Sequence, residues 1–128
     1  MQVHSISPMF DKDSKVLILG SFPSVKSREQ NFFYGHPQNR FWAVLSNVFN
    51  DELPKTIEER KAFLLKHNVA VWDVIERCEI VNSSDSSIKN VTANDLSKIL
   101  NVANIKNIYV NGKTAEKFYI KYIENVIN

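Results

Sequence analysis

Amide, hydroxyl and aromatic side chains concentrate in a few segments of the sequence that could form a binding site. Residues 20–24 read Gly-Ser-Phe-Pro-Ser and follow an apolar run. Backbone N–H groups in such a turn can face an anion or a flat polar ligand. A tight turn without a ligand explains the segment equally well.

Residues 31–42 form the most informative of these segments. Phe32, Phe33 and Tyr34 offer flat faces on which a nucleobase could stack. Asn39 opens a predicted helix, where its side chain could cap backbone donors or present an amide to a ligand. Both interpretations of Asn39 stay open on the residues alone.

Asp73 and Asn111 stand at the ends of two further apolar runs. Asp73 could orient a water molecule or bond nearby backbone, and Asn111 with Gly112 could meet a ligand or form a turn. The sequence contains neither GK[ST] nor GxGxxG. It also shows no Ser-His-Asp, paired-carboxylate or metal-ligand spacing, which argues against ordinary hydrolases and metalloenzymes. We therefore expect no metal and no other cofactor.

The elements that must position these residues follow from apolar periodicity. Short apolar runs at 15–19, 69–74 and 108–110 predict strands buried on both faces, as in a parallel sheet. The polar segment 79–90 is expected to be a loop within the domain. The predicted helices cover residues 39–49, 56–68, about 94–103 and 115–126.

The order of these elements predicts an α/β fold in which helices cover both faces of a parallel sheet. Ligands of such sheets bind beyond the carboxyl ends of the strands, where three predicted loops fall: residues 20–37, 73–87 and 111–114. The first predicted helix has an apolar stripe of Phe41, Trp42, Val44, Leu45, Val48 and Phe49. The second predicted helix has capping-box spacing at Thr56, and Ala62 and Phe63 are expected on its buried side. Asn68 is expected to end this helix in the left-handed conformation.

Length and composition fit one folded domain. The chain has 128 residues, of which 44% are hydrophobic and 23% charged, and its net charge of +2 permits a polyanionic partner without requiring one. The single cysteine, Cys78, excludes an internal disulfide framework and a multi-cysteine zinc site, and we expect it to be structural. No signal-peptide pattern or membrane-length apolar run occurs, so we expect a cytoplasmic protein without membrane contact.

Two stretches resemble the uracil-DNA glycosylase superfamily. Residues 16–24, Val-Leu-Ile-Leu-Gly-Ser-Phe-Pro-Ser, and residues 33–42, Phe-Tyr-Gly-His-Pro-Gln-Asn-Arg-Phe-Trp, are closest to the hypoxanthine-DNA (deoxyinosine) glycosylase branch, with its G-S-x-P-G and Y-Y-x-H-P-x-N-x-F-W motifs. Further segments at 71–74, 84–88, 94–95 and 111–115 are also similar. The resemblance therefore extends from about residue 16 to residue 118.

The resemblance implies a three-layer sandwich and removal of a deaminated base that is flipped out of DNA, hypoxanthine first and uracil second. In the family, the position of Phe22 often carries a water-activating Asp or Asn, and the resemblance implies that Asn39 takes the catalytic role in its place. It also implies that Tyr34 stacks on the base and makes Asn111 a second candidate for reading or activating it. The resemblance also implies base contacts from Gly20, Ser21, Phe22 and Pro23, and DNA contacts from Ser24, Lys26, Arg40 and Lys113.

The sequence departs from the family pattern in two places. Ser24 replaces the usual glycine of the first motif. The family also continues into a fourth parallel strand and a Ser/Pro-rich loop, so we expect residues 1–128 to be one domain that is incomplete at its C-terminus, with three strands of an expected four and an open sheet edge. The expected partner is DNA containing a deaminated base, with no obligate protein partner.

Two other functions remain open from the sequence. The chain could be a catalytically inert DNA- or nucleotide-binding remnant, because Phe22 cannot activate water and the expected C-terminal loop is missing. It could also be a small-molecule enzyme on the same fold, because a fold does not determine a function.

Overall fold

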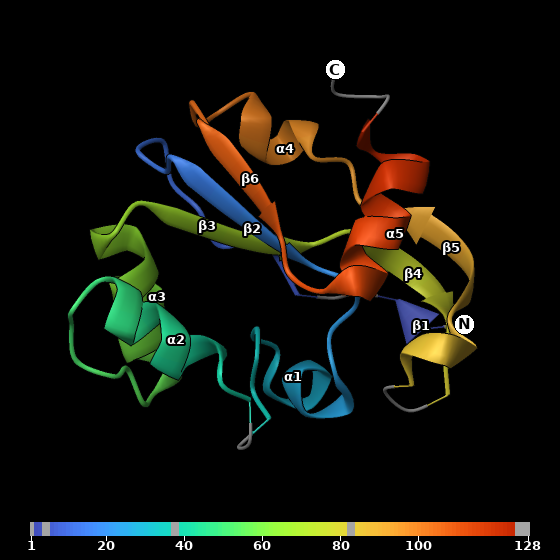
Figure 1. Cartoon of the computed structure of the whole chain (residues 1–128), viewed down its shortest axis with the longest axis horizontal. Helices are drawn as coiled ribbons and strands as arrows, with labels where there is room; N and C mark the ends of the chain where they lie inside the picture. The colour runs from blue at the N-terminus through green and yellow to red at the C-terminus, as the bar shows by residue number, and fades with distance from the viewer. Residues whose placement is uncertain (1, 4–5, 37–38, 82–83, 125–128) are drawn as a thin grey trace.

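The computed structural model describes residues 2–3, 6–36, 39–81 and 84–124, and its centre is a parallel sheet (Figure 1). Strands β2 (Val16–Gly20), β3 (Val69–Asp73) and β6 (Asn107–Val110) pair in the order β3-β2-β6. These are the three strands that the sequence predicts, and the predicted α/β class is confirmed. Gly20 pairs with Asp73, and the N–H of Asn111 donates to the carbonyl of Leu19 at 2.7 Å. All three strands therefore end at one edge of the sheet.

Helices cover the sheet as layers on either side of it. Helices α2 (Phe41–Val48) and α3 (Ile57–Lys66) lie on one side, and α4 (Ser97–Leu100) and α5 (Lys113–Tyr122) lie on the other (Figure 1). The predicted capping box of α3 is present, with Thr56 and Glu59 bonding each other's backbone N–H. Asn68 has φ +59°, as predicted for a left-handed stop.

The apolar stripe of α2 is only partly buried, which corrects the sequence expectation. Trp42 and Leu45 are buried, whereas Val44 is 53% and Val48 69% exposed. Ala62, expected on the buried side of α3, is exposed as well. Periodicity shows which residues share a face, but only the neighbours of a helix decide how far that face is covered.

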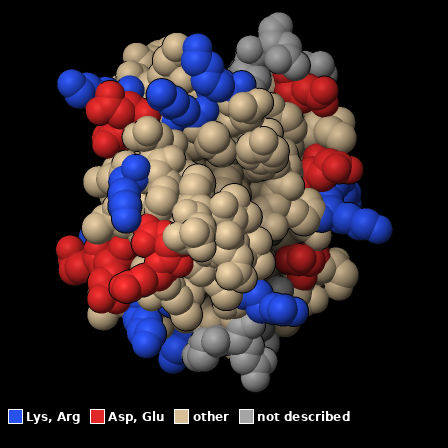
Figure 2. Space-filling view, turned by 60° about the vertical axis from the view of Figure 1, so that its left-hand side comes forward, with Lys and Arg blue, Asp and Glu red and all other residues tan. Residues whose placement is uncertain are grey.

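Charged side chains on the face seen in Figure 2 lie around the margin of a broad uncharged area.

A second, antiparallel sheet was not predicted. Strands β1 (Gln2–Val3), β4 (Ile75–Glu79) and β5 (Lys89–Ala93) pair in the order β1-β4-β5, and the 3-10 helix η1 (Asp85–Ser87) lies between the last two. The prediction of a loop over residues 79–90 is therefore wrong at its two ends, because Glu79 belongs to β4 and residues 89–90 belong to β5. A strand with one solvated face has polar residues at alternate positions, and its sequence can pass for a loop.

Two short helices also differ from expectation. Helix α1 (Val25–Gln30) lies in a stretch predicted as loop, between the N-cap Ser24 and Asn31 at φ +55°. Helix α4 is shorter than the predicted 94–103. Oδ1 of Asp95 accepts from the N–H of Ser97, a local bond that competes with an earlier helix start, whereas Nδ2 of Asn94 donates to the carbonyl of Asp73 in β3.

Among the described residues, no helix is both long and apolar enough to cross a membrane. Cys78 is buried in β4 with a free thiol, and burial raises the pKa of that thiol, in agreement with a structural role.

Candidate active site

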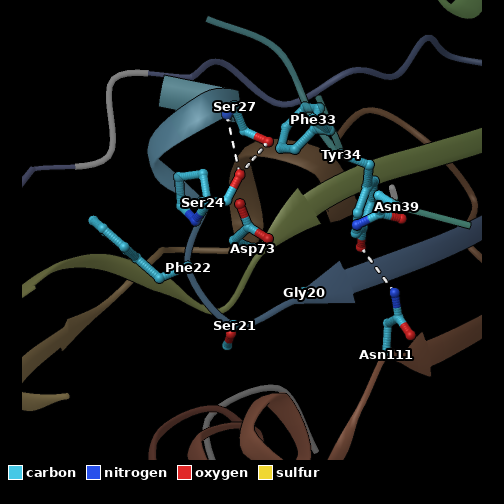
Figure 3. A pocket seen from close by; sticks show the side chains of 11 residues that line it. Gly20, Ser21, Phe22, Ser24, Ser27, Phe33, Tyr34, Asn39, Asp73 and Asn111 are labelled. Carbon is cyan, nitrogen blue, oxygen red and sulfur yellow. Dashed lines mark hydrogen bonds between the residues drawn. The ribbon is translucent and has the colours of Figure 1, made fainter. Parts of the chain in front are cut away.

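A pocket lies beyond the carboxyl ends of β2 and β3, where an open parallel sheet places its ligands (Figure 3). Its volume of about 160 Å³ is below the roughly 300–1,000 Å³ of drug-sized ligand sites, and suits one flat ring system. The lining residues are Gly20, Ser21, Phe22, Pro23, Ser24, Ser27, Phe33, Tyr34, Asn39, Asp73 and Asn111.

Gly20 and Asp73 are both buried and line the pocket where β2 and β3 end. They face each other across the β2–β3 ladder, and the N–H of Val74 donates to the Gly20 carbonyl at 2.7 Å. A Cβ atom on residue 20 would collide with Oδ1 of Asp73 and lie 3.2 Å from Oη of Tyr34. Glycine is therefore required here for space, because it lets a carboxylate and a phenol approach the same point of the backbone.

Tyr34 is held in an unusual conformation by its neighbours. Its φ of +52° is rare for a bulky residue and costs on the order of 1–3 kcal/mol. The ring stacks on Phe41 with centroids 3.8 Å apart, and the carbonyl accepts from Nε1 of Trp42 at 3.2 Å. Nδ2 of Asn111 donates to Oη at 3.3 Å. Burial, and then the negative charge of Asp73, raise the pKa of the Tyr34 phenol, so it stays protonated at neutral pH.

A buried serine joins the two segments that flank the pocket. Oγ of Ser27, in α1, accepts from the N–H of Gly35 at 2.9 Å and from the hydroxyl of Ser24 at 3.1 Å. Oγ of Ser24 in turn accepts from the N–H of Ser27 at 3.1 Å as the N-cap of α1 (Figure 3). The loop after β2 and the aromatic segment before α2 are thereby fixed to each other.

Asn39 lies at the mouth of the pocket with an exposed side chain. Its N–H donates to the carbonyl of His36 at 2.9 Å, and its Oδ1 accepts from the N–H of Phe41 at 2.8 Å. The N-cap of α2 is Arg40, which makes no side-chain cap bond, so Asn39 stands one residue before the cap and bonds the first N–H of the helix while it also lines the pocket. An amide oxygen has two lone pairs, so this contact leaves Oδ1 able to accept a second hydrogen bond.

Most of the predicted site residues come together. The sheet edge and the aromatic segment bring eight of them into one pocket: Gly20, Ser21, Phe22, Pro23, Ser24, Tyr34, Asn39 and Asn111. Lys26, Arg40 and Lys113 do not line it. Lys26 pairs with Glu29 at 3.7 Å, Arg40 lines an adjoining groove, and Lys113 begins α5.

The aromatic residues divide into different roles. Phe32 is 4% and Phe33 2% exposed, so the expectation that a base could stack on them is wrong for Phe32, which packs against Trp42 in the core. Phe33 lines the pocket without an exposed face. The ring of Phe22 points away from Tyr34 (Figure 3). It lies under the Arg28 guanidinium, whose carbon is 5.4 Å from the ring centroid.

Sequence reasoning left Ser27 out of the site, considered Phe33 only as a stacking face, and left the role of Asp73 open between orienting a water molecule and bonding nearby backbone. The sequence could have placed Asp73 in the site, because Asp73 ends a buried strand at the sheet edge where ligands bind. Nothing in the sequence placed Ser27 there beyond its spacing of three from Ser24. Its contact with Gly35 depends on the tertiary fold.

The model of the uracil DNA glycosylase superfamily matches residues 7–127 of the chain. The chain belongs to this superfamily. A hypoxanthine DNA glycosylase of Methanosarcina barkeri is 30% identical over 120 residues, which cover 92% of this chain and 76% of that protein. The protein of the same name from Methanosarcina acetivorans is 33% identical over 112 residues, covering 86% and 71%.

A solved structure supports the fold of this superfamily member. The solution NMR structure of a candidate uracil DNA glycosylase from Methanosarcina acetivorans superimposes with a TM-score of 0.81 at 26% identity, over 94% of this chain and 75% of that one. The predicted resemblance is thus confirmed. Membership in the superfamily makes the chain a glycosylase, a hydrolase that acts on DNA.

Proposed function

We propose that this glycosylase removes hypoxanthine, and with lower preference uracil, from nucleotides flipped out of DNA. The observation that carries the proposal is that residues from three separate segments, predicted to bind or activate a base, line one pocket of ring size. The names of the two Methanosarcina relatives support hypoxanthine as the first candidate. In the reaction, water forms a bond to C1′ of the sugar, the N-glycosidic bond breaks, and the base leaves with a proton.

The pocket provides a site for the extruded base. The face of Tyr34 opposite Phe41 is the surface on which the ring would stack, because Phe41 already occupies the other face. The backbone of the loop from Gly20 to Pro23 would contact the base edge. Asn111, held against the Tyr34 hydroxyl, is a second candidate for binding the base.

Asn39 is placed to orient the attacking water. Its position at the mouth is on the side of the sugar, because the base must enter the pocket while attached to DNA. The N–H of Phe41 holds one lone pair of Oδ1, and the other can accept from a water molecule. An amide is a weak base, so the rate gain would come from orientation and from stabilising the departing base.

Side chains around the mouth would hold the DNA backbone. Ser24 borders the pocket, Arg40 follows Asn39, and Lys113 follows Asn111 by two positions. Lys26 lies on α1 next to the first motif. We propose that these four residues contact phosphates, which would make DNA binding weaken with salt.

The proposal is tested by single-turnover base release from an oligonucleotide that carries one deoxyinosine, with a deoxyuridine oligonucleotide in parallel. Asn39→Ala should slow release by at least about 100-fold while salt-dependent DNA binding persists. Asn104→Ala, which changes an exposed asparagine after α4, is the matched control and should act like wild type.

Thermal melting of both variants shows whether the loss of the bond between the Phe41 N–H and Asn39 affects folding. Full activity of a folded Asn39→Ala protein would refute the role of Asn39. Wild-type protein that binds DNA but releases no base at any enzyme concentration would refute the proposed activity and favour the inert binding remnant.

A further inference from the structure

A second cavity adjoins the base pocket, and the proposed reaction does not use it. This cavity, the α2–β6 groove, has a volume of about 530 Å³ and lies between helix α2 and the strands β2 and β6. It shares Asn39 and Asn111 with the base pocket. Resting on the proposed function, we propose that this groove holds the base of the nucleotide next to the flipped one in the same DNA strand, stacked on Tyr109.

The walls of the α2–β6 groove suit a flat, uncharged ring. Ile18 pairs with Tyr109 in the sheet, and both line one side of the groove. The other side consists of α2 residues, Phe41, Val44 and Leu45. No acidic residue is among the described residues that line the groove. Its volume lies within the roughly 300–1,000 Å³ of small-molecule sites, so it is large enough for one nucleobase.

Tyr109 provides the open aromatic surface of this groove. It is 58% exposed, although its ring is large and mostly apolar. Phe41, in contrast, already stacks on Tyr34 and meets the ring of Trp42 edge-on. Proteins that bind single-stranded nucleic acid stack bases on aromatic side chains of this kind. An exposed tyrosine among apolar neighbours is therefore typical of a surface that a partner covers.

The position of the groove also agrees with the covalent structure of DNA. One phosphate joins the flipped nucleotide to its neighbour, and it must pass from the mouth of the base pocket to the groove. Asn39 and Asn111 border both cavities and lie on the side of the pocket away from Phe22 (Figure 3). Arg40 lines the groove, is exposed, and pairs with no carboxylate in the part of the chain that the structure describes. Its guanidinium can bind the linking phosphate, so the groove combines an aromatic surface with a phosphate-binding cation.

Removal of one base from the DNA tests this contact without any change in the protein. Single-stranded oligonucleotides carry one deoxyinosine, and an abasic tetrahydrofuran unit replaces the nucleotide on its 5′ or its 3′ side. No complementary strand is present, so the missing base cannot ease flipping by weakening a duplex. Affinity is measured by fluorescence anisotropy, with a 2′-fluoro sugar at the lesion that suppresses base release. For wild-type protein, the abasic unit on one side should weaken binding by about 5- to 100-fold, and on the other side by less than about twofold.

Variants of Tyr109 show whether its ring causes this loss. Tyr109→Thr removes the ring and keeps a β-branched residue in the strand. This variant should bind the complete and the abasic oligonucleotides with affinities within about twofold, because the base has lost its stacking surface. Tyr109→Phe keeps the ring and should retain the full effect of the abasic unit. Val102→Thr, at a residue that is 56% exposed and lines neither cavity, is the matched control and should act like wild type.

Three results would overturn this assignment. The first is a wild-type affinity that the abasic unit changes by less than about twofold on both sides. The second is a Tyr109→Thr variant that binds every oligonucleotide more weakly by the same factor, because the residue and the neighbouring base would then act independently. The third is a melting temperature for Tyr109→Thr more than about 5 °C below that of Val102→Thr, which would show that protein, such as a second copy of the chain, covers Tyr109.

The proposed function is tested separately by base release from the deoxyinosine oligonucleotide without the 2′-fluoro group. Wild-type protein that shows the abasic effect on binding and releases no hypoxanthine would refute the proposed function and support the assignment of the groove. Release of hypoxanthine without any abasic effect would do the reverse.

Discussion

Removal of the Ser27 hydroxyl tests the view that one buried side chain holds the two sides of the pocket together. Ser27 is 2% exposed, and its Oγ accepts from the N–H of Gly35 and the hydroxyl of Ser24. Ser27→Ala leaves the Gly35 N–H without that acceptor in a buried place. It leaves the N–H of residue 27 itself bonded to Ser24, so α1 keeps its cap.

The expected cost follows from these contacts. An unsatisfied buried donor costs about 1–3 kcal/mol, and the loss of the Ser24 contact adds a smaller amount because Ser24 can turn toward water. For a urea m-value of about 2 kcal/mol/M, a loss of about 2 kcal/mol lowers the unfolding midpoint by roughly 1 M. Base release should fall as well, because the segment that carries Tyr34 and Asn39 is no longer fixed to the loop after β2.

The assay is urea unfolding followed by circular dichroism, with single-turnover base release on the same preparations. Ser86→Ala, at an exposed serine whose hydroxyl bonds that of exposed Ser84, is the matched control and should change the stability by less than about 0.5 kcal/mol. A Ser27→Ala midpoint equal to that of the control would refute the view that this hydroxyl joins the two segments.

Two more predictions concern Gly20 in the pocket and the interactions of Asp51 with His67 and Lys66. Gly20→Ala should lose about 1–3 kcal/mol of stability in urea unfolding and most of its base release, because the new Cβ displaces the Asp73 carboxylate; wild-type values for both would contradict the geometry. The bonds from His67 and Lys66 hold the pKa of Asp51 well below its usual range, so this carboxylate stabilises the fold above pH of about 4 and progressively less in stronger acid. Thermal melting should therefore show Asp51→Asn less stable than wild type at pH 5, with a difference that shrinks toward pH 2; a constant difference would contradict this.

The sequence was sufficient to predict the parallel sheet and most of the pocket because both depend on strong local signals. Continuous apolar runs mark strands buried on both faces, and the residues that follow them must meet at one sheet edge. Gly20 and Asn111 could be placed there on this argument alone. The roles of Tyr34 and Asn39 required the family motif, because nothing local shows which residues of the long segment after the first strand reach the ligand.

The features that the sequence did not predict depend on tertiary contacts. Strand β5 has no buried residue in its five positions, so its composition resembles a loop. Val44 and Val48 keep helical spacing with Phe41, which is three and seven positions before them, yet only part of that face is buried. The bond between Ser27 and Gly35 joins residues eight apart through a turn that no periodicity describes.

The junction between the two sheets makes the pocket sensitive to local unfolding of the antiparallel sheet. A single residue, Val74, separates β3 from β4; its N–H donates to Gly20, and its carbonyl accepts from the N–H of Asn94. The antiparallel sheet of β1, β4 and β5 therefore cannot separate from the parallel sheet at this point without loosening the backbone next to Asp73. Amide hydrogen exchange at Val74 and Asn94 should report openings of the base pocket itself, and DNA that fills the pocket should slow exchange at both amides together.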